Sequence, residues 1–213
     1  MTDVWSERAE AYRASDAHRQ GRDLELFAEW AAGKTVLDVA TGGGHVAARL
    51  REAGCEVVTC DPAPGMRPDV VSRAEDLPFA DGSFDVVACR IAAHHFADAR
   101  KAVEEMARVT ARLVVIEDNL FIDDAVEEAE RLRDPTHVRC YSEEEWKEML
   151  ADAGLEVEQV ARFERRPVVD EWLARVKTPA EDARRVRELL GDRVVDGALS
   201  LKSLVVKARR SQR

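Results

Sequence analysis

Short apolar runs alternate with amphipathic segments along the first half of this chain of 213 residues. The apolar runs are rich in β-branched residues and predict strands near residues 35–40, 56–60, 69–72, 84–89 and 112–117. Helical spacing of apolar positions predicts helices near 3–14, 20–32, 45–53 and 97–109. Strands that alternate with helices predict an α/β fold with a mostly parallel, doubly wound sheet.

The second half of the chain leaves this alternation. Helices are expected near 123–133 and 142–153, and Ser142 with Glu145 forms a capping box for the second of them. Strands near 155–163 and 199–207 predict an antiparallel edge of the sheet. Thr178-Pro179 begins a further helix that Gly191 can end.

A glycine-rich loop follows the first predicted strand, at residues 42–44. Glycines let a ligand approach the backbone, and the free amides of a helix that begins near Gly44 favour an anionic group. Residues 42–47 also satisfy the G-x-G-x-x-A fingerprint of dinucleotide-binding domains. In that fingerprint the glycines follow the strand directly, whereas here Asp38 lies inside the strand and two residues separate the strand from the first glycine.

A second acid ends the next predicted strand, at Asp61. A carboxylate at the carboxyl end of a strand, one βαβ step after the glycine loop, can accept hydrogen bonds from both hydroxyls of a ribose. Asp61 therefore indicates a nucleoside ligand. It does not separate a dinucleotide from other adenosine cofactors, because both classes use such an acid.

The segment from Ala74 to Phe96 carries the most specific motif, a Leu-Pro-Phe sequence followed by an Asp-Gly turn and a buried strand. It resembles the adenine-binding and fourth-strand motifs of ubiquinone/menaquinone-type methyltransferases, and the glycine loop with Asp38 resembles the first motif of class I S-adenosylmethionine-dependent methyltransferases. Residues 11–24 and 131–146 resemble the N-terminal lid and the segment after the fifth strand in one branch of that superfamily.

This resemblance implies a Rossmann-like sheet, S-adenosylmethionine as cofactor and S-adenosylhomocysteine as product. It places Asp38 near the cofactor's ammonium group, Asp76 at the adenine amino group, Met66 over the adenine and Tyr12 as a lid over the methionine end. The cofactor-binding residues expected in this way are Tyr12, Asp38, Ala40, Thr41, Gly42, Gly44, His45, Asp61, Pro62, Met66, Ala74, Glu75, Asp76 and Arg90.

The chain departs from the family pattern after Asp61. Residues 62–68 contain three prolines and a glycine, where the family usually has a full helix, and they cannot form a regular helix. We expect the adenine platform to lie on a loop there, which leaves the strength of cofactor binding open. The turn before the fifth strand, residues 109–112, is also shorter than the family's.

A sulfonium methyl group is already activated, so methyl transfer needs mainly alignment and exclusion of water. A base is needed only if the acceptor must lose a proton, and His94 or His95, after the fourth predicted strand, is the candidate. The alternative is that this pair caps a helix and packs. Candidate acceptor-binding residues are His18, Asp118, Asn119, Arg133, His137 and Arg139, although an acidic surface with ion pairs would also explain several of them.

We expect one domain over residues 1–213, made of an N-terminal helical lid (1–32), a cofactor-binding core (33–120), an acceptor-covering insert (121–154) and C-terminal strands and helices (155–213). The expected activity is methylation of carbon or oxygen in a small molecule. Two alternatives stay open: a cofactor-binding relative with weak or no transferase activity, and a dinucleotide-dependent oxidoreductase, for which no hydride-transfer set of Tyr and Lys is visible.

Charge and composition exclude several partners. A formal net charge of −10 argues against a nucleic-acid substrate, because phosphates require a basic face. No apolar stretch has the length of a membrane span and no signal-peptide pattern is present, so we expect a cytoplasmic protein without membrane insertion. The sequence leaves the oligomeric state open between a monomer and a homodimer. The four cysteines lack metal-binding spacing, so we expect reduced thiols and no metal.

Overall fold

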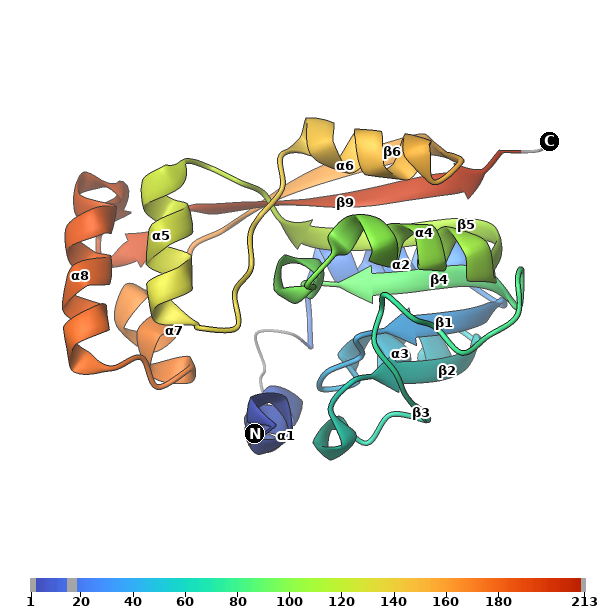
Figure 1. Ribbon diagram of the computed structural model, residues 1–213, viewed down its shortest axis with the longest axis horizontal. Helices are drawn as coiled ribbons and strands as arrows, with labels where there is room; N and C mark the ends of the chain where they lie inside the picture. Colours follow the sequence, from blue (N-terminus) through green and yellow to red (C-terminus); the bar gives the residue numbers. More distant parts are fainter. Residues whose placement is uncertain (1–2, 15–18, 212–213) are drawn as a thin grey trace.

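The computed structural model describes residues 3–14 and 19–211. Its centre is a seven-stranded sheet with the order β3-β2-β1-β4-β5-β9-β6 (Figure 1). Five strands are parallel: β1 (Thr35–Val39), β2 (Glu56–Asp61), β3 (Val70–Val71), β4 (Phe84–Arg90) and β5 (Thr110–Asn119). The antiparallel strands β9 (Leu201–Arg210) and β6 (Leu155–Arg165) complete it. The predicted α/β fold with an antiparallel C-terminal edge is confirmed.

Alternate residues of the strands face opposite helical layers. Leu37 and Val39 of β1 belong to one hydrophobic cluster with α4 (Ala99–Val109) and α6 (Glu143–Asp152). Val36 belongs to a second cluster with α2 (Arg22–Ala31) and α3 (His45–Glu52). Since both faces of the central strands are buried, these strands have the continuous apolar sequences from which they were predicted.

The helix boundaries follow from local sequence signals. The capping box of Ser142 and Glu145 is present at the start of α6. Asp98 caps α4 by accepting from the Lys101 amide at 2.9 Å. At the other end of the chain, α8 (Ala180–Leu190) ends at Gly191, whose φ of 45° lies in the left-handed region. The predicted start of α6 and the predicted end of α8 are confirmed.

A smaller hydrophobic core lies beyond the carboxyl ends of the parallel strands. There α5 (Asp124–Arg133), α7 (Val169–Arg175) and α8 pack around residues that include Trp172 and Leu190 (Figure 1). We call these three helices the helical cap. The sequence did not predict α7 or the hairpin of β7 (Val194–Val195) and β8 (Ala198–Leu199), because elements this short carry little periodicity.

The predicted acceptor-covering insert, residues 121–154, is not one structural unit. Its first helix, α5, belongs to the helical cap, whereas α6 packs on the sheet, with Trp146 buried in the main core. The cap is completed by α7 and α8, which the prediction had assigned to the C-terminal part. Order along the chain does not show which core an amphipathic helix joins, so this division of the segment could not be seen in the sequence.

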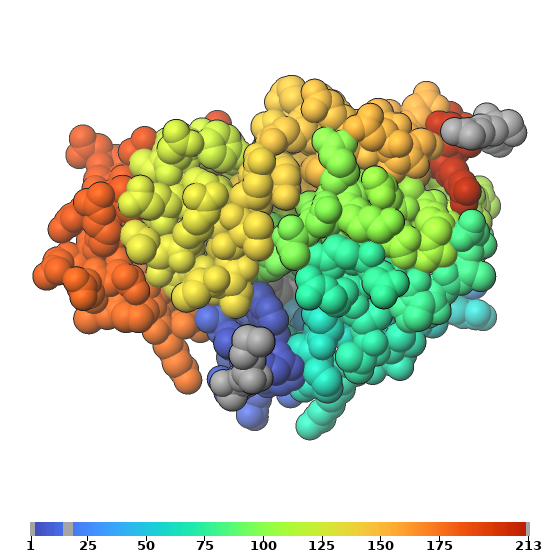
Figure 2. All heavy atoms as spheres, in the orientation of Figure 1, coloured from blue at the N-terminus to red at the C-terminus, as the bar shows by residue number. Residues whose placement is uncertain are grey.

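Helix α1 (Val4–Arg13) bridges the sheet and the cap. On one side Ser6 Oγ accepts from the Gly65 amide at 2.8 Å, within the single 3₁₀ turn η2 (Pro64–Met66) that replaces a regular helix as expected. On the other side Arg8 pairs with Asp134 at 3.0 Å. Figure 2 shows α1, in blue, below the yellow segment of α5 and beside the teal segment that contains η2. Helix α1 thus lies over the carboxyl edge of the sheet. The second helix of the expected lid, α2, packs instead on one face of the sheet.

Two sequence expectations concern the chain as a whole. All four cysteines are buried free thiols, in agreement with the prediction. Within residues 3–14 and 19–211, none of the helices combines the length and the apolar character that a bilayer span requires.

Candidate active site

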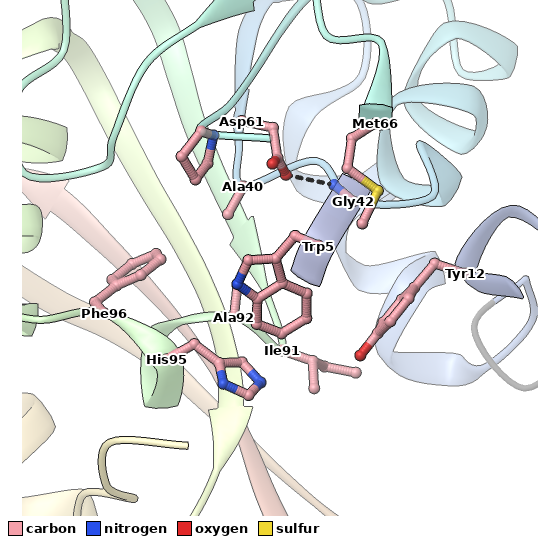
Figure 3. Close-up of a pocket in the computed structure, with 11 residues that line it drawn as sticks. Trp5, Tyr12, Ala40, Gly42, Asp61, Met66, Ile91, Ala92, His95 and Phe96 are labelled. Carbon is pink, nitrogen blue, oxygen red and sulfur yellow. Dashed lines mark hydrogen bonds between the residues drawn. The ribbon is translucent and has the colours of Figure 1, made fainter. Parts of the chain in front are cut away.

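Two cavities lie at the carboxyl edge of the sheet, near the point between β1 and β4 where the strand order reverses. The first, which we call the cleft cavity, measures about 120 Å³. The second, the cap cavity, measures about 290 Å³ and extends to the helical cap. Tyr12, Ile91 and His95 line both, so the two cavities meet there. The cleft cavity is lined by Trp5, Tyr12, Ala40, Gly42, Asp61, Pro62, Met66, Ile91, Ala92, His95 and Phe96 (Figure 3).

The carboxylate of Asp61 forms the polar wall of the cleft cavity. One of its oxygens accepts from the Gly42 amide at 3.0 Å and the other from the Ala63 amide at 2.9 Å (Figure 3). Each carboxylate oxygen can accept a further hydrogen bond. Burial raises the pKa of Asp61, and the two amide hydrogen bonds oppose that effect. The position fits the predicted contact with a ribose.

Aromatic and aliphatic side chains close the rest of the cleft cavity. Trp5 and Tyr12 reach into it from α1, and Met66 lines it from η2 (Figure 3). Trp5 lies with its ring centroid 4.7 Å from that of His95. Our sequence prediction missed Trp5. The available signal was its spacing of seven residues from Tyr12, which places both rings on one face of a helix.

Two non-glycine residues beside the cleft cavity have left-handed backbones. Ala40 has a φ of 54° and Ile91 a φ of 53°. This conformation is costly for a β-branched residue such as Ile91, and backbone strain of this kind concentrates at functional sites. Both residues line the cleft cavity, which makes this cavity the candidate functional centre.

Asp38 lies behind the glycine loop and lines neither cavity. Its side chain accepts from Thr41 Oγ1 at 2.6 Å and is 1% exposed. Burial is the main cause that raises the pKa of Asp38 to about 7. Asp38 therefore holds the loop in shape, and its predicted contact with an ammonium group stays a prediction.

Asp38→Asn is expected to change how stability depends on pH. The pKa of Asp38 is about 7 in the fold, whereas its ordinary value is 3.8, so between these pH values the native chain keeps a proton that the unfolded chain has lost. The stabilisation that comes from this proton is complete at low pH and is lost as the pH rises to about 7. Asparagine does not titrate, so the free energy of unfolding should fall less steeply, by up to about 1 kcal/mol per pH unit, between about pH 5 and pH 7. Urea unfolding at several pH values measures both slopes; equal slopes would contradict the assignment.

The other predicted cofactor residues outside both cavities are Thr41, Gly44, His45, Ala74, Glu75, Asp76 and Arg90. His45 Nε2 lies 2.9 Å from the Tyr12 carbonyl oxygen and thus ties the loop to α1. Asp76 is exposed, and Glu75 accepts from the Ala97 amide at 3.0 Å. The side chain of Arg90 is buried and forms ion pairs with Asp23 and Glu117. His45, Glu75 and Arg90 thus make contacts within the protein, and the predicted cofactor contacts of this group stay predictions.

His94 and Asp118 form a buried pair beside the point where the cavities meet. His94 Nδ1 lies 2.5 Å from one oxygen of Asp118, and the other oxygen accepts from the His94 amide at 2.7 Å. Burial lowers the pKa of His94, but the charge and the hydrogen bond of Asp118 raise it by more than burial lowers it. The pKa of His94 is therefore above its ordinary value. Because Asp118 fixes Nδ1 as the protonated nitrogen, Nε2 is the atom that can take a proton. His94 lines the cap cavity.

His95 has the opposite electrostatic environment. Its Nδ1 lies 3.0 Å from the Thr136 carbonyl oxygen, and its ring centroid is 4.1 Å from that of His94. Burial and the neighbouring His94 lower its pKa well below the usual value. His95 is therefore a neutral wall between the cavities, and His94 is the better candidate base.

The predicted acceptor-binding residues divide into two groups. Asn119 and Arg133 line the cap cavity, where the Arg133 guanidinium stacks 4.3 Å from the Trp172 ring centroid. Asp118, His137 and Arg139 line neither cavity. Asp118 is engaged by His94, and Arg139 pairs at 2.6 Å with Glu145 and borders a separate hollow. Their contact with an acceptor stays a prediction. His18 lies outside the described residues.

His137 is instead part of a buried cluster with Glu127 and Cys140, whose potential ligand atoms lie within 4.8 Å of one another. Glu127 is already engaged by His137 at 3.0 Å, by the Cys140 amide at 3.1 Å and by Arg131 at 3.3 Å. Since a guanidinium already balances the carboxylate, hydrogen bonding accounts for this cluster. It fastens the loop after α5 to that helix.

Sequence reasoning missed the residues that the chain beyond residue 160 contributes to the cap cavity. These are Arg165, Arg166, Pro167, Trp172, Arg175 and Leu201, from the end of β6 and the residues after it, from α7 and from the start of β9. No motif marks them, because their proximity to His94 arises only from the fold. Their positions matter for the choice of acceptor.

Comparisons with known proteins agree with this geometry. Residues 37–113 match a family model described as a methyltransferase domain. The uncharacterized methyltransferase YcgJ of Bacillus subtilis is 34% identical over 208 residues, which cover 85% of this chain and 82% of the relative. Its crystal structure superimposes with a TM-score of 0.81 at 29% identity over 90% of this chain and 99% of that chain.

Similarity to quinone-modifying enzymes is confined to a part of the chain. Demethylmenaquinone methyltransferase of Paenarthrobacter aurescens is 41% identical over 98 residues, which are 40% of this chain and 39% of that enzyme. These comparisons decide against the dinucleotide interpretation of the glycine loop. The chain belongs to the class I S-adenosylmethionine-dependent methyltransferases.

Proposed function

We propose that the cleft cavity binds S-adenosylmethionine and that the cap cavity binds a small methyl acceptor. The observation that carries this proposal is that the two cavities meet at Tyr12, Ile91 and His95, beside the His94–Asp118 pair. The cap cavity of about 290 Å³ suits a small molecule.

The residues of the cleft cavity fit an adenosine cofactor. The Asp61 carboxylate is able to accept from ribose hydroxyls, and Met66 offers an apolar contact for a base. Gly42, with a φ of 52°, brings the backbone to the cavity wall without a side chain. Bound S-adenosylmethionine supplies an electrophilic methyl group, so the protein's tasks are to align the acceptor and exclude water.

Four further residues exclude water or move a proton during the transfer. Trp5 and Tyr12 cover the cleft from α1 and exclude water, so we infer that α1 lifts when the cofactor enters or leaves. His94 Nε2 takes the acceptor's proton, and Asp118 stabilises the resulting imidazolium. This assignment favours an acceptor with an ionisable hydroxyl, enol or amine.

Turnover tests the proposal. The chain is incubated with S-adenosylmethionine and a panel of phenols, hydroxy acids and amines, and formation of S-adenosylhomocysteine is measured against reactions without acceptor. We expect at least one acceptor to raise the rate well above background. Tight cofactor binding without turnover across a broad panel would favour the cofactor-binding relative that lacks transferase activity.

A further inference from the structure

Building on the proposed function, the geometry points to an acceptor that carries a carboxylate or phosphate group, bound in the cap cavity by Arg166 and Arg175. Both arginines line this cavity and are exposed, whereas His94 lines it from a buried position. The anionic group would therefore lie at the solvent side, and the methyl-accepting atom would lie toward His94.

The other charges around the cap cavity are balanced. Arg133 pairs with Glu130 at 3.3 Å, and Asp134 pairs with Arg8. Arg165 pairs with Glu117, which also binds Arg90, and Arg90 binds Asp23. The last four residues form a network of two cations and two anions, which leaves no carboxylate over for further arginines.

Arg166 and Arg175 are the exception. In the part of the chain that the structure describes, neither has an ion-pair or side-chain hydrogen-bond partner, although the chain has 42 acidic and 32 basic residues. Arg175 also lies close enough to Arg133 to act on it: burial, and to a smaller extent the charge of Arg175, lower the pKa of Arg133. Two uncompensated guanidinium groups on one cavity attract an anion in an otherwise acidic protein.

The chemistry of these groups defines the ligand class. The planar guanidinium fork matches the two oxygens of a carboxylate or phosphate. The same cavity also offers Ile91, Trp172 and Leu201 as apolar lining. A compact acceptor with one anionic end for the arginines, an apolar or aromatic body for the apolar lining, and a methyl-accepting atom near His94 fits this cavity.

Binding of benzoate, phenyl phosphate and the neutral benzyl alcohol tests the inference. Each is titrated by calorimetry at low salt into the full chain, with and without saturating S-adenosylhomocysteine. The test variant is Arg166→Gln/Arg175→Gln. The matched control, Arg112→Gln/Arg184→Gln, makes the same change of charge at exposed positions that line neither cavity.

We expect at least one of the two anions to bind more tightly than benzyl alcohol, and to lose roughly tenfold or more in affinity in the test variant but not in the control. The preferred anion distinguishes a carboxylate from a phosphate acceptor. Equal binding of the three probes, or wild-type anion affinity in the test variant, would overturn the inference. S-adenosylhomocysteine affinity should stay unchanged in both variants. If the chain bound no S-adenosylhomocysteine while the anion effect persisted, the proposed function would fail and the anion site would stand.

Discussion

His94→Gln is expected to lower kcat for methyl transfer roughly 10²- to 10⁴-fold, the usual contribution of a general base. Glutamine keeps a polar side chain of similar reach but cannot take a proton near neutral pH. In the unmodified protein, kcat/KM should rise with pH through the His94 pKa, which Asp118 raises against the effect of burial. This rise should be absent in the variant. Steady-state rates of S-adenosylhomocysteine formation across pH measure both effects.

His95→Gln is the matched control for this experiment. His95 has a pKa far below the usual value and its Nδ1 faces the Thr136 carbonyl, so loss of its imidazole should cost less than the loss of His94. Asp118→Asn should shift the rise in kcat/KM to lower pH, because the negative charge of Asp118, which raises the pKa of His94, is removed. If His94→Gln retained the full kcat and pH profile, the acceptor would need no base and the assigned role of His94 would be wrong.

Asp61→Asn is expected to weaken binding of S-adenosylhomocysteine roughly 100-fold. The variant retains one accepting oxygen, but its NH2 group donates and cannot accept a hydrogen bond from a ribose hydroxyl. Hydrogen bonds to charged groups are worth about 1.5–3 kcal/mol each. The substitution also leaves the Gly42 or Ala63 amide without its acceptor, which disturbs the glycine loop. Calorimetric titration measures the change in Kd.

A second aspartate separates this effect from a general loss of charge. Asp192 is exposed in the 3₁₀ turn η4 (Gly191–Arg193), after the helical cap, and Asp192→Asn should bind S-adenosylhomocysteine as the unmodified chain does. Thermal unfolding of both variants shows whether the fold is retained. A folded Asp61→Asn protein with unchanged affinity would rule out the ribose contact.

The fold could be predicted because its signals are local. Buried strands of a parallel sheet have apolar sequences, and the glycine loop and Asp61 stand at strand ends that the sheet brings to one edge. Caps such as Ser142 with Glu145 fix helix starts without reference to the rest of the chain. The cleft cavity was predictable in part, since Gly42, Asp61 and Met66 line it and Trp5 was missed.

Side-chain direction and long-range pairing could not be predicted. Asp38 precedes the loop as a cofactor-contacting acid would, but its side chain turns behind the loop to Thr41. Arg90 was expected at the cofactor because the sequence does not show that Asp23 and Glu117 surround it. The cap cavity depends on α7 and the end of β6, whose distance from His94 along the chain conceals their proximity in space.

Whether the cleft cavity is a working cofactor site is tested most directly by calorimetry. The unmodified chain is titrated with S-adenosylhomocysteine and, in parallel, with NAD. We expect one site of micromolar or tighter affinity for S-adenosylhomocysteine and no binding of NAD, since the cleft cavity offers Asp61 and apolar walls for a single nucleoside. The absence of S-adenosylhomocysteine binding would contradict this expectation, and would mean that the chain keeps the methyltransferase fold without a working cofactor site.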